Sequence, residues 1–167
     1  VNRNRQRSPR PLVLGVGNSM KGDDGVGPYV AARLGLAGSA PCGGAAAARS
    51  LISLDCGTTP ENYTSVVRQL RPRTLLIVDA AEMGLEPGEC RIIAPERVGG
   101  LGLSTHSMPL SLFMNYVQDL AGQVVLIGVQ PRGMAVGGLM SPEVTAAGEM
   151  LAELIARGLW KTIVRLA

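Results

Sequence analysis

The chain has 167 residues, which is a typical length for one compact domain. Hydrophobic residues make up 46% of it and aromatic residues only 3%, so we expect a core of mainly aliphatic side chains. The net charge of +3 arises from arginines near the start, and the rest of the chain is close to neutral, which argues against a nucleic-acid-binding surface. These arginines are Arg3, Arg5, Arg7 and Arg10.

The sequence predicts a cytoplasmic protein. The arginine-rich start is not followed by the apolar segment of a signal peptide, and no apolar run reaches the roughly 18 residues of a membrane span. The cysteines, Cys42, Cys56 and Cys90, are widely spaced and form no CxxC pair. We therefore expect reduced thiols rather than disulfides or a structural zinc site.

The first part of the chain contains a sharp change of pattern. Residues 1–10 are predicted to form a disordered basic tail, and a single domain is expected over residues 11–167. A short apolar run at 12–17 predicts a buried strand that ends in glycine; a polar loop follows it, and residues 26–36 predict a helix. The Ala- and Gly-rich residues 37–49 are expected to form a loop or an insertion.

Strands and helices are expected to alternate through the rest of the chain. Apolar runs predict strands at 51–55, 74–79, 90–94 and 124–129, and helical spacing predicts helices at 60–70, 107–120 and 142–158. This order is typical of a mostly parallel sheet with helices on both faces. We therefore predict the α/β fold class, with a single three-layer domain around a mostly parallel five-stranded sheet.

Several polar residues directly follow predicted strands. In an open α/β sheet, ligands bind beyond the carboxyl ends of the strands, so these residues are the first candidates for a site. His106 is the only histidine of the chain and precedes a predicted helix. The full set of candidates is Asn18, Asp23, Asp24, Asp55, Asp79, His106 and Gln130.

Each acidic or imidazole candidate also has a structural interpretation. Asp24 stands at the start of a predicted helix, where an acid stabilises unpaired amides, and Asp23 competes with it for either role. Asp79 ends an apolar strand, where an ionised carboxylate needs a partner such as loop amides or a metal. His106 can cap the helix that follows it. Asp55 precedes Cys-Gly-Thr, which favours a turn.

Asp24, Asp79 and His106 together predict a metal site. Two carboxylates and one imidazole suit a borderline divalent metal such as nickel or zinc, and three protein ligands leave positions open for a substrate. A Ser-His-Asp triad is disfavoured because the chain has no GxSxG motif. A nucleotide-binding loop is disfavoured because Met20 stands at the third glycine of the dinucleotide fingerprint and there is no Walker lysine pattern.

Four segments of the chain form recognisable motifs. They are GVGNSMKGDDGVGP at 15–28, IVDAAEMG at 77–84 with Pro87 and Gly88 after it, THSMPL at 105–110, and LIGVQP at 126–131. In sequence and order these segments resemble the hydrogenase maturation protease family, over about residues 12–156. The resemblance is strongest to the branch that processes the large subunit of hydrogenase 3 in formate hydrogenlyase.

The resemblance implies an aspartic-type endopeptidase with a phosphorylase/hydrolase-like fold. Members of the family cut a short C-terminal peptide from the large-subunit precursor of a [NiFe] hydrogenase after nickel insertion, and the nickel serves as recognition element. Carried over to this chain, Asp24, Asp79 and His106 would be both the catalytic and the metal-contacting residues. The nickel would be supplied by the bound precursor. We also expect a monomer.

The chain departs from the family pattern in two places. The basic tail at 1–10 and the Ala- and Gly-rich stretch at 37–49 have no recognised counterpart, while some relatives carry glutamate at the position of Asp24.

One alternative function uses the same site, namely that of a non-catalytic nickel chaperone or scaffold. It would bind the precursor through the same three residues without removing a peptide.

Overall fold

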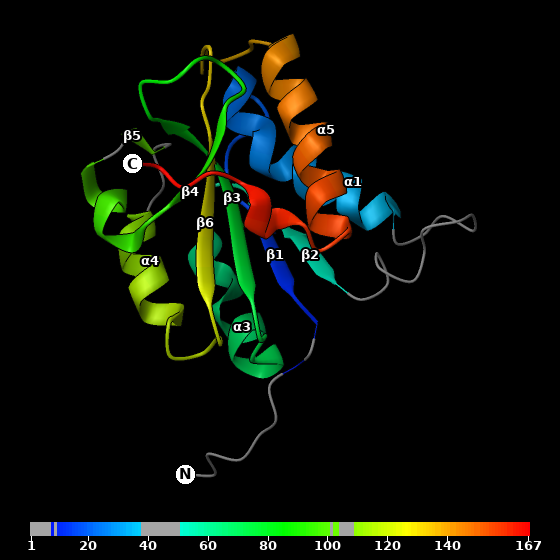
Figure 1. Ribbon diagram of the computed structural model, residues 1–167, viewed down its shortest axis with the longest axis vertical. Helices are drawn as coiled ribbons and strands as arrows, with labels where there is room; N and C mark the ends of the chain where they lie inside the picture. The colour runs from blue at the N-terminus through cyan, green and yellow to red at the C-terminus, as the bar shows by residue number, and fades with distance from the viewer. Residues whose placement is uncertain (1–7, 9, 38–50, 101, 104–108) are drawn as a thin grey trace.

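The computed structural model describes residues 8, 10–37, 51–100, 102–103 and 109–167. Its centre is a sheet whose main path joins five strands, shown in Figure 1. Along the sheet these are β2 (Ile52–Asp55), β1 (Leu12–Gly15), β3 (Leu75–Glu82), β6 (Val124–Val129) and β4 (Cys90–Ile93). The pairs of β1 with β2, β1 with β3, and β3 with β6 are parallel, while β4 runs antiparallel to β6.

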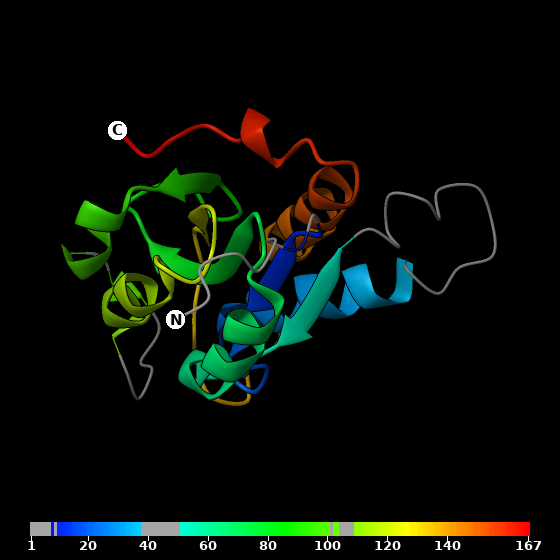
Figure 2. The ribbon, with the colours of Figure 1, turned by 90° about the horizontal axis from the view of Figure 1, so that it is seen from below.

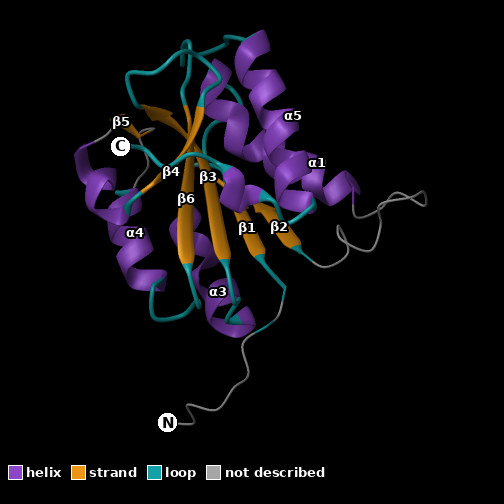
Figure 3. Cartoon of the chain, in the orientation of Figure 1, coloured by secondary structure: helices purple, strands orange, loops and turns teal. Residues whose placement is uncertain are grey.

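Helices cover both faces of this sheet. In Figure 3 the strands fan out between α4 on one side and the pair of α1 and α5 on the other. The helices are α1 (Val26–Ala37), α3 (Thr64–Leu70), α4 (Leu110–Val117) and α5 (Pro142–Ala156). Short 3-10 helices add η1 (Gly22–Gly25), η2 (Pro60–Tyr63), η3 (Pro95–Gly100) and η4 (Trp160–Thr162). Among the described residues, every helix is too short or too polar to cross a membrane.

The two faces of β3 carry the two halves of the core, because successive side chains of a strand point to opposite sides of the sheet. Leu76 and Val78 belong to the cluster that packs with α1 and α5, and Ile77 and Ala81 belong to the cluster that packs with α3 and α4. Figure 2 shows α1 and α5 lying together when the fold is viewed from below. Since both faces are covered, β3 is buried from Leu75 to Ala81, as its apolar sequence predicts.

The predicted fold class, the five strands and the mostly parallel sheet are confirmed, and two details differ. β3 continues to Glu82, so Asp79 lies inside the strand and the expectation that it ends the strand was wrong. The extension is paired, because Ala80 lies opposite Val129 of β6 and Ala81 lies opposite Leu103 of a short strand, β5 (Gly102–Leu103). This sixth strand was not expected from the sequence.

The order of the strands creates a switch point between β1 and β3. The chain leaves β1 through α1 to β2 on one side, then returns past β1 through α3 to β3 on the other. Connections that diverge from neighbouring strands leave a crevice at their carboxyl ends, where ligands bind in folds of this type. In Figure 1 these ends point to the top, where the loop from β6 to α5 also passes.

The predicted tail and insertion fall almost wholly outside the described residues. Of the tail over 1–10, Ser8 and Arg10 are described. The N–H of Ser8 donates to the carbonyl of Arg71 at 3.1 Å, and its carbonyl accepts from the N–H of Arg73 at 3.0 Å. Only the first residue of the expected loop at 37–49 is described, as the last residue of α1. The disorder of the tail stays a prediction.

Candidate active site

Glycines bring η1 and α1 directly onto the ends of β1 and β3. Gly17 has a φ of +137°, and a Cβ on it would lie 1.9 Å from the carbonyl oxygen of Asp24. A Cβ on Gly27 would lie 2.1 Å from the carbonyl oxygen of Val16 and 2.4 Å from that of Val78. No other residue type fits such contacts. The glycines of this motif therefore serve close backbone packing at the switch point.

Asp23 anchors the loop that connects β6 to α5. Its side chain is 1% exposed and accepts three backbone hydrogen bonds from that loop. Oδ2 accepts from the N–H of Arg132 at 2.7 Å and from that of Gly133 at 3.0 Å, and Oδ1 accepts from the N–H of Ser141 at 2.6 Å. The N–H of Asp23 itself donates to the carbonyl of Gly133 at 3.1 Å. Both oxygens of this carboxylate are therefore occupied by the protein.

The charge of Asp23 is maintained by these amides. Burial alone would raise the pKa of its carboxyl group, but the N–H groups of Ser141, Gly133 and Arg132 together outweigh burial and lower that pKa below its ordinary value. Asp23 is thus an ionised structural residue. The sequence left it as a rival of Asp24 for a catalytic role, and the geometry assigns the two acids different surroundings.

Asp24 is buried beside Asp23 but has an oxygen without a partner. Its side chain is 3% exposed, and Oδ2 accepts from the N–H of Asn18 at 3.1 Å. Oδ1 is buried and has no hydrogen-bond partner among the described residues. A buried carboxylate oxygen in this state is costly unless a ligand completes it. Asp24 is therefore fixed through one oxygen and able to bind through the other.

Asp79 lies on the opposite side of the switch point. Its side chain is fully buried in β3, on the face of the sheet that Ile77 and Ala81 share, and its partner on β6 is Gly128. The preceding residue, Val78, accepts a hydrogen bond from the N–H of Val16 at 2.8 Å, and η1 packs against β3. The structure thus brings Asp24 and Asp79 to the same edge of the sheet, as the sequence predicted.

His106 lies outside the described residues, so its place in the site stays a prediction. Within the described ranges, no group of three His, Cys, Asp or Glu side chains has the geometry of a metal site. The predicted metal set includes His106, so it is not tested by that finding. The chain is described again from Pro109, directly before α4, which packs on the face of the sheet that carries Asp79.

Asp55 ends β2 and Cys56 follows it at the same edge. The Oδ1 of Asp55 accepts from the N–H of Gly57 at 2.9 Å, which is the turn role that the sequence favoured. Cys56 is buried and free, and burial, with a smaller contribution from the charge of Asp55, raises the pKa of its thiol to about 12. The thiol is therefore protonated at neutral pH. The raised pKa argues against a thiolate nucleophile at this position.

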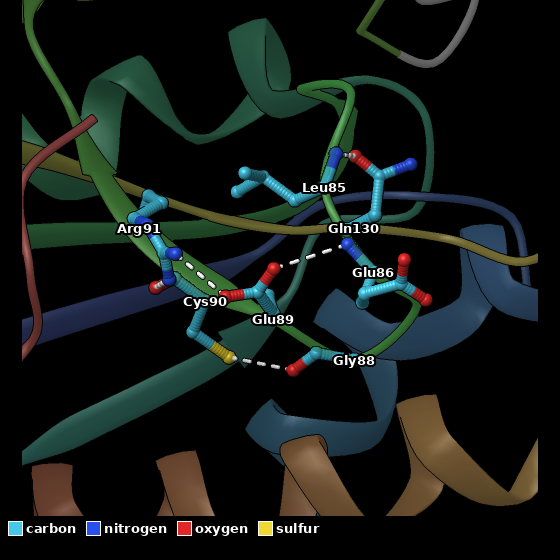
Figure 4. Close-up of polar contacts among 7 residues, drawn as sticks. All are labelled: Leu85, Glu86, Gly88, Glu89, Cys90, Arg91 and Gln130. Atoms are coloured by element: carbon cyan, nitrogen blue, oxygen red, sulfur yellow. Dashed lines mark hydrogen bonds and ion pairs between the residues drawn. The ribbon is translucent and has the colours of Figure 1, made fainter. Parts of the chain in front are cut away.

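Gln130 holds the connection between β3 and β4. Its Oε1 accepts from the N–H of Met83 at 2.7 Å and from that of Leu85 at 3.2 Å, and its Nε2 donates to Oε2 of Glu82 at 2.9 Å. Figure 4 shows the bond to Leu85 and, beside it, the carboxylate of Glu89 between Arg91 and the N–H of Glu86. Gln130 was a candidate because it follows a strand. Its side-chain amide instead holds this loop through hydrogen bonds.

A groove crosses the carboxyl ends of β1 and β2 next to the loop that binds Asp24. It consists of two pockets of about 210 and 350 Å³, which share Ser19, Pro28 and Asp55. The smaller pocket also reaches Asn18, whose N–H holds Asp24, and the larger one extends over α1 to the loop before α5. The wall formed by Gly138, Leu139 and Met140 was not predictable from the sequence, because these residues follow the glycine loop by more than 100 positions.

Comparison with known sequences gives a consistent result. The family described as Hydrogenase maturation protease matches residues 46–158. The Hydrogenase 3 maturation protease of Escherichia coli (strain K12) is 42% identical over 121 residues, which cover 72% of each chain. A putative hydrogenase maturation protease of Methanocaldococcus jannaschii is 30% identical over 122 residues, again 72% of each chain.

Solved structures share the whole architecture. The crystal structure of a Hydrogenase 3 Maturation protease superposes with a TM-score of 0.80 at 35% identity, covering 95% of this chain and 97% of that one. The crystal structure of the [NiFe] hydrogenase maturation protease HycI from Thermococcus kodakarensis KOD1 gives a TM-score of 0.76 at 34% identity, covering 90% and 92%.

Proposed function

Because the chain belongs to the hydrogenase maturation protease family, we propose that it trims the C-terminal extension from the large-subunit precursor of a [NiFe] hydrogenase. The cut follows nickel insertion, and the enzyme works as a monomer in the cytoplasm. Family membership supports the peptidase activity. The more specific claim, that nickel in the precursor is the recognition element, draws its support from the geometry of one acid.

The observation that carries this proposal is the unpaired oxygen of Asp24. A buried carboxylate with one oxygen fixed by Asn18 and the other without a partner among the described residues fits an incoming cation. A carboxylate oxygen is an acceptable ligand for divalent nickel, although softer ligands bind that metal more tightly. We assign Asp24 the role of contacting nickel that the precursor already holds through its own ligands.

Asp79 and His106 complete the proposed contact. Asp79 is fully buried at the same edge of the sheet, and a second carboxylate strengthens attraction for a cation in an interior that screens charge poorly. His106 would supply the imidazole. Because the enzyme offers at most three ligands and the precursor offers the rest, the metal arrives and leaves with the substrate, and nickel-free precursor lacks one binding determinant.

The reaction adds water across one peptide bond. The water oxygen bonds to the carbonyl carbon, the bond from carbon to nitrogen breaks, and the leaving amine takes up a proton. Either Asp24 or Asp79 can accept the proton of the attacking water as general base. Substrate nickel offers a second route by polarising the carbonyl or the water. Asp23 takes no part, because both of its oxygens accept backbone hydrogen bonds. The enzyme is thus of the aspartic type without needing a pepsin-like pair.

The test compares nickel-loaded with nickel-free precursor. We expect purified protein to shorten the loaded large subunit by its C-terminal peptide, as measured by mass spectrometry, and to leave the nickel-free form uncut over the same time. Equal cleavage of both forms contradicts nickel recognition but not the peptidase activity. Binding of the loaded precursor with no change in its mass supports the chaperone alternative instead.

Variants of the remaining site residues test their assignment. Asp79→Ala and His106→Ala are expected to abolish processing while the circular dichroism spectrum stays that of the native fold. Glu153→Ala is the control, because Glu153 is an exposed acid of α5 that pairs with Arg157 and lines neither pocket of the groove. Normal processing by either site variant would show that the assignment is wrong.

A further inference from the structure

The three most exposed large apolar side chains of the described residues lie together beside the candidate site. Leu139 is 93% exposed, Val136 is 76% exposed and Met20 is 72% exposed. We call these three residues the apolar rim. Met20 belongs to the glycine loop and the other two to the loop before α5, and the carbonyl of Met20 accepts from the N–H of Gly137 at 2.8 Å. Two segments that are distant in the sequence thus bring exposed apolar residues close together.

The apolar rim is fixed to the residue next to Asp24. The loop that carries Val136 and Leu139 is held at both ends by the Asp23 carboxylate, through Gly133 and Ser141. This loop contains no charged residue from 134 to 140. Such a surface is costly in water and is retained where it contacts a partner. Its attachment to η1 sets the rim at a constant position relative to the catalytic acid.

The rim borders the larger pocket of the groove. That pocket has a volume of about 350 Å³ and is lined by Leu139 and Met140 on one side and by Tyr29 and Ala32 of α1 on the other. Its volume lies within the range of ligand sites in proteins. Its walls are mainly apolar, with the carboxylate of Asp55 at one end. The site therefore continues outward into an apolar cavity large enough for a side chain.

We propose that the apolar rim is the docking surface for the hydrogenase precursor, and that an apolar side chain of the precursor enters the 350 Å³ pocket. This inference rests on the proposed function. Asp24 is held by the N–H of Asn18, two residues before Met20, so a polypeptide that brings nickel and a scissile bond to Asp24 comes close to the rim. Docking there would bury the apolar area and hold the extension in the groove.

The surroundings favour the precursor over other occupants. A second copy of the chain seated on the rim would cover the groove and block the substrate. An anionic lipid surface would approach the carboxylates of Asp24, Asp55 and Asp79, which disfavour it, and the nearby Arg132 is already paired with Glu143. A polypeptide with apolar side chains and a bound cation matches both the rim and the acids.

The experiment measures precursor cleavage by a double variant, Val136→Ser with Leu139→Ser. We expect KM for the nickel-loaded precursor to rise about tenfold or more while kcat stays within about twofold, because the lost contacts are made before the reaction. Val164→Ser is the matched control: Val164 is 63% exposed, away from the groove, and both constants should stay at the wild-type values. Thermal unfolding of all variants should match the wild type, since the changed side chains are exposed.

A second pair of variants tests the pocket. Ala32→Trp fills it from the exposed surface of α1 and should raise KM in the same way, whereas Ala32→Ser leaves it open and should not. Titration of loaded precursor into Asp24→Asn protein, with and without the rim changes, compares two affinities in one cleavage-deficient background that lacks the proposed nickel contact. We expect the rim changes to weaken binding about tenfold in that background.

The outcomes separate the two proposals. If the wild type does not cut the precursor, the proposed function is wrong, and the titration still reports on docking. If the wild type cuts it and the rim variants keep the wild-type KM and affinity, the docking surface is wrong. A fall in kcat alone also contradicts docking. A wild-type dimer that the rim changes dissociate in sedimentation, or rim-dependent binding to phosphatidylglycerol vesicles, would assign the surface to another occupant.

Discussion

Asp23 and Asp24 are neighbours in η1, equally buried, and opposite in their surroundings. Asp23 faces the loop before α5 and accepts three backbone hydrogen bonds, while Asp24 faces the glycine loop and accepts one. One carboxylate is saturated by the protein and the other keeps an oxygen without a partner. The difference shows that a pair of acids can divide support and chemistry between them. The saturated member fixes the segment that the reactive member needs.

The largest effect is expected for Asp24→Asn. The amide keeps an acceptor for the N–H of Asn18 but removes the charge that would contact nickel or take a proton, so processing should fall by about a thousandfold. The free energy of unfolding should change little, because the lost oxygen has no hydrogen bond to lose among the described residues. A mass-spectrometric time course and urea unfolding measure the two quantities. Near-normal processing would remove the distinction between the two acids.

Gly27→Ala tests the packing that supports both acids. Its Cβ would lie 2.1 Å from the carbonyl oxygen of Val16, so η1 and α1 must move away from the sheet, at a cost of about 3 kcal/mol in the free energy of unfolding. Gly35→Ala in the same helix is the control. Among the described residues its Cβ would have only Ser53 Oγ nearby, at 3.8 Å, and the change should stabilise the helix by up to about 1 kcal/mol. Equal effects of both changes in urea unfolding would contradict this packing.

Asp23→Asn should lower stability rather than remove the chemistry. An amide has one acceptor oxygen where the carboxylate has two, so at least one N–H from Arg132, Gly133 or Ser141 loses its partner, and the free energy of unfolding should fall by about 2 kcal/mol. Hydrogen exchange at Ser141 and Gly133 should become faster. Asp55→Asn, with one exposed turn contact, serves as control. A fully stable Asp23→Asn protein would show that the anchor is dispensable.

The pH dependence of this loss gives the smallest and most specific signal. The pKa of Asp23 is lower in the folded state, since the amides outweigh burial, so its stabilising contribution is present above the unfolded-state pKa of about 3.9. That contribution disappears as the pH falls through the folded-state pKa. The difference in unfolding free energy between wild type and Asp23→Asn should stay level from about pH 7 to pH 5 and shrink below about pH 4. A difference that stays constant to pH 3 would contradict the assigned charge.

Much of the fold was predictable from hydrophobic patterning. Apolar runs and helical spacing located the five strands and the helices to within a few residues. The sequence did not reveal β5, because its two residues, Gly102 and Leu103, carry no pattern of their own. The antiparallel direction of β4 was predictable, because residues 83–89 are too few for the crossover that a parallel strand requires.

The candidate site was predictable in position but not in its division of roles. Strand ends placed Asp24 and Asp79 at one edge, and the structure brings them there. Local sequence could not separate Asp23 from Asp24, because the partners that saturate Asp23 lie from 109 to 118 residues further along the chain. The apolar rim was not predictable for the same reason, since Met20 and Leu139 become neighbours only through the fold.

The loop before α5 is held at its two ends by the same side chain. The carboxylate of Asp23 accepts hydrogen bonds from Arg132 and Gly133 at one end of the loop and from Ser141 at the other. The two ends are therefore held in place whichever residues lie between them. Substitutions between Met134 and Met140 can therefore accumulate in related enzymes without disturbing α5 or the reacting acids. Transplanting that interior between related enzymes should therefore transfer the choice of client protein while the chemistry stays in place.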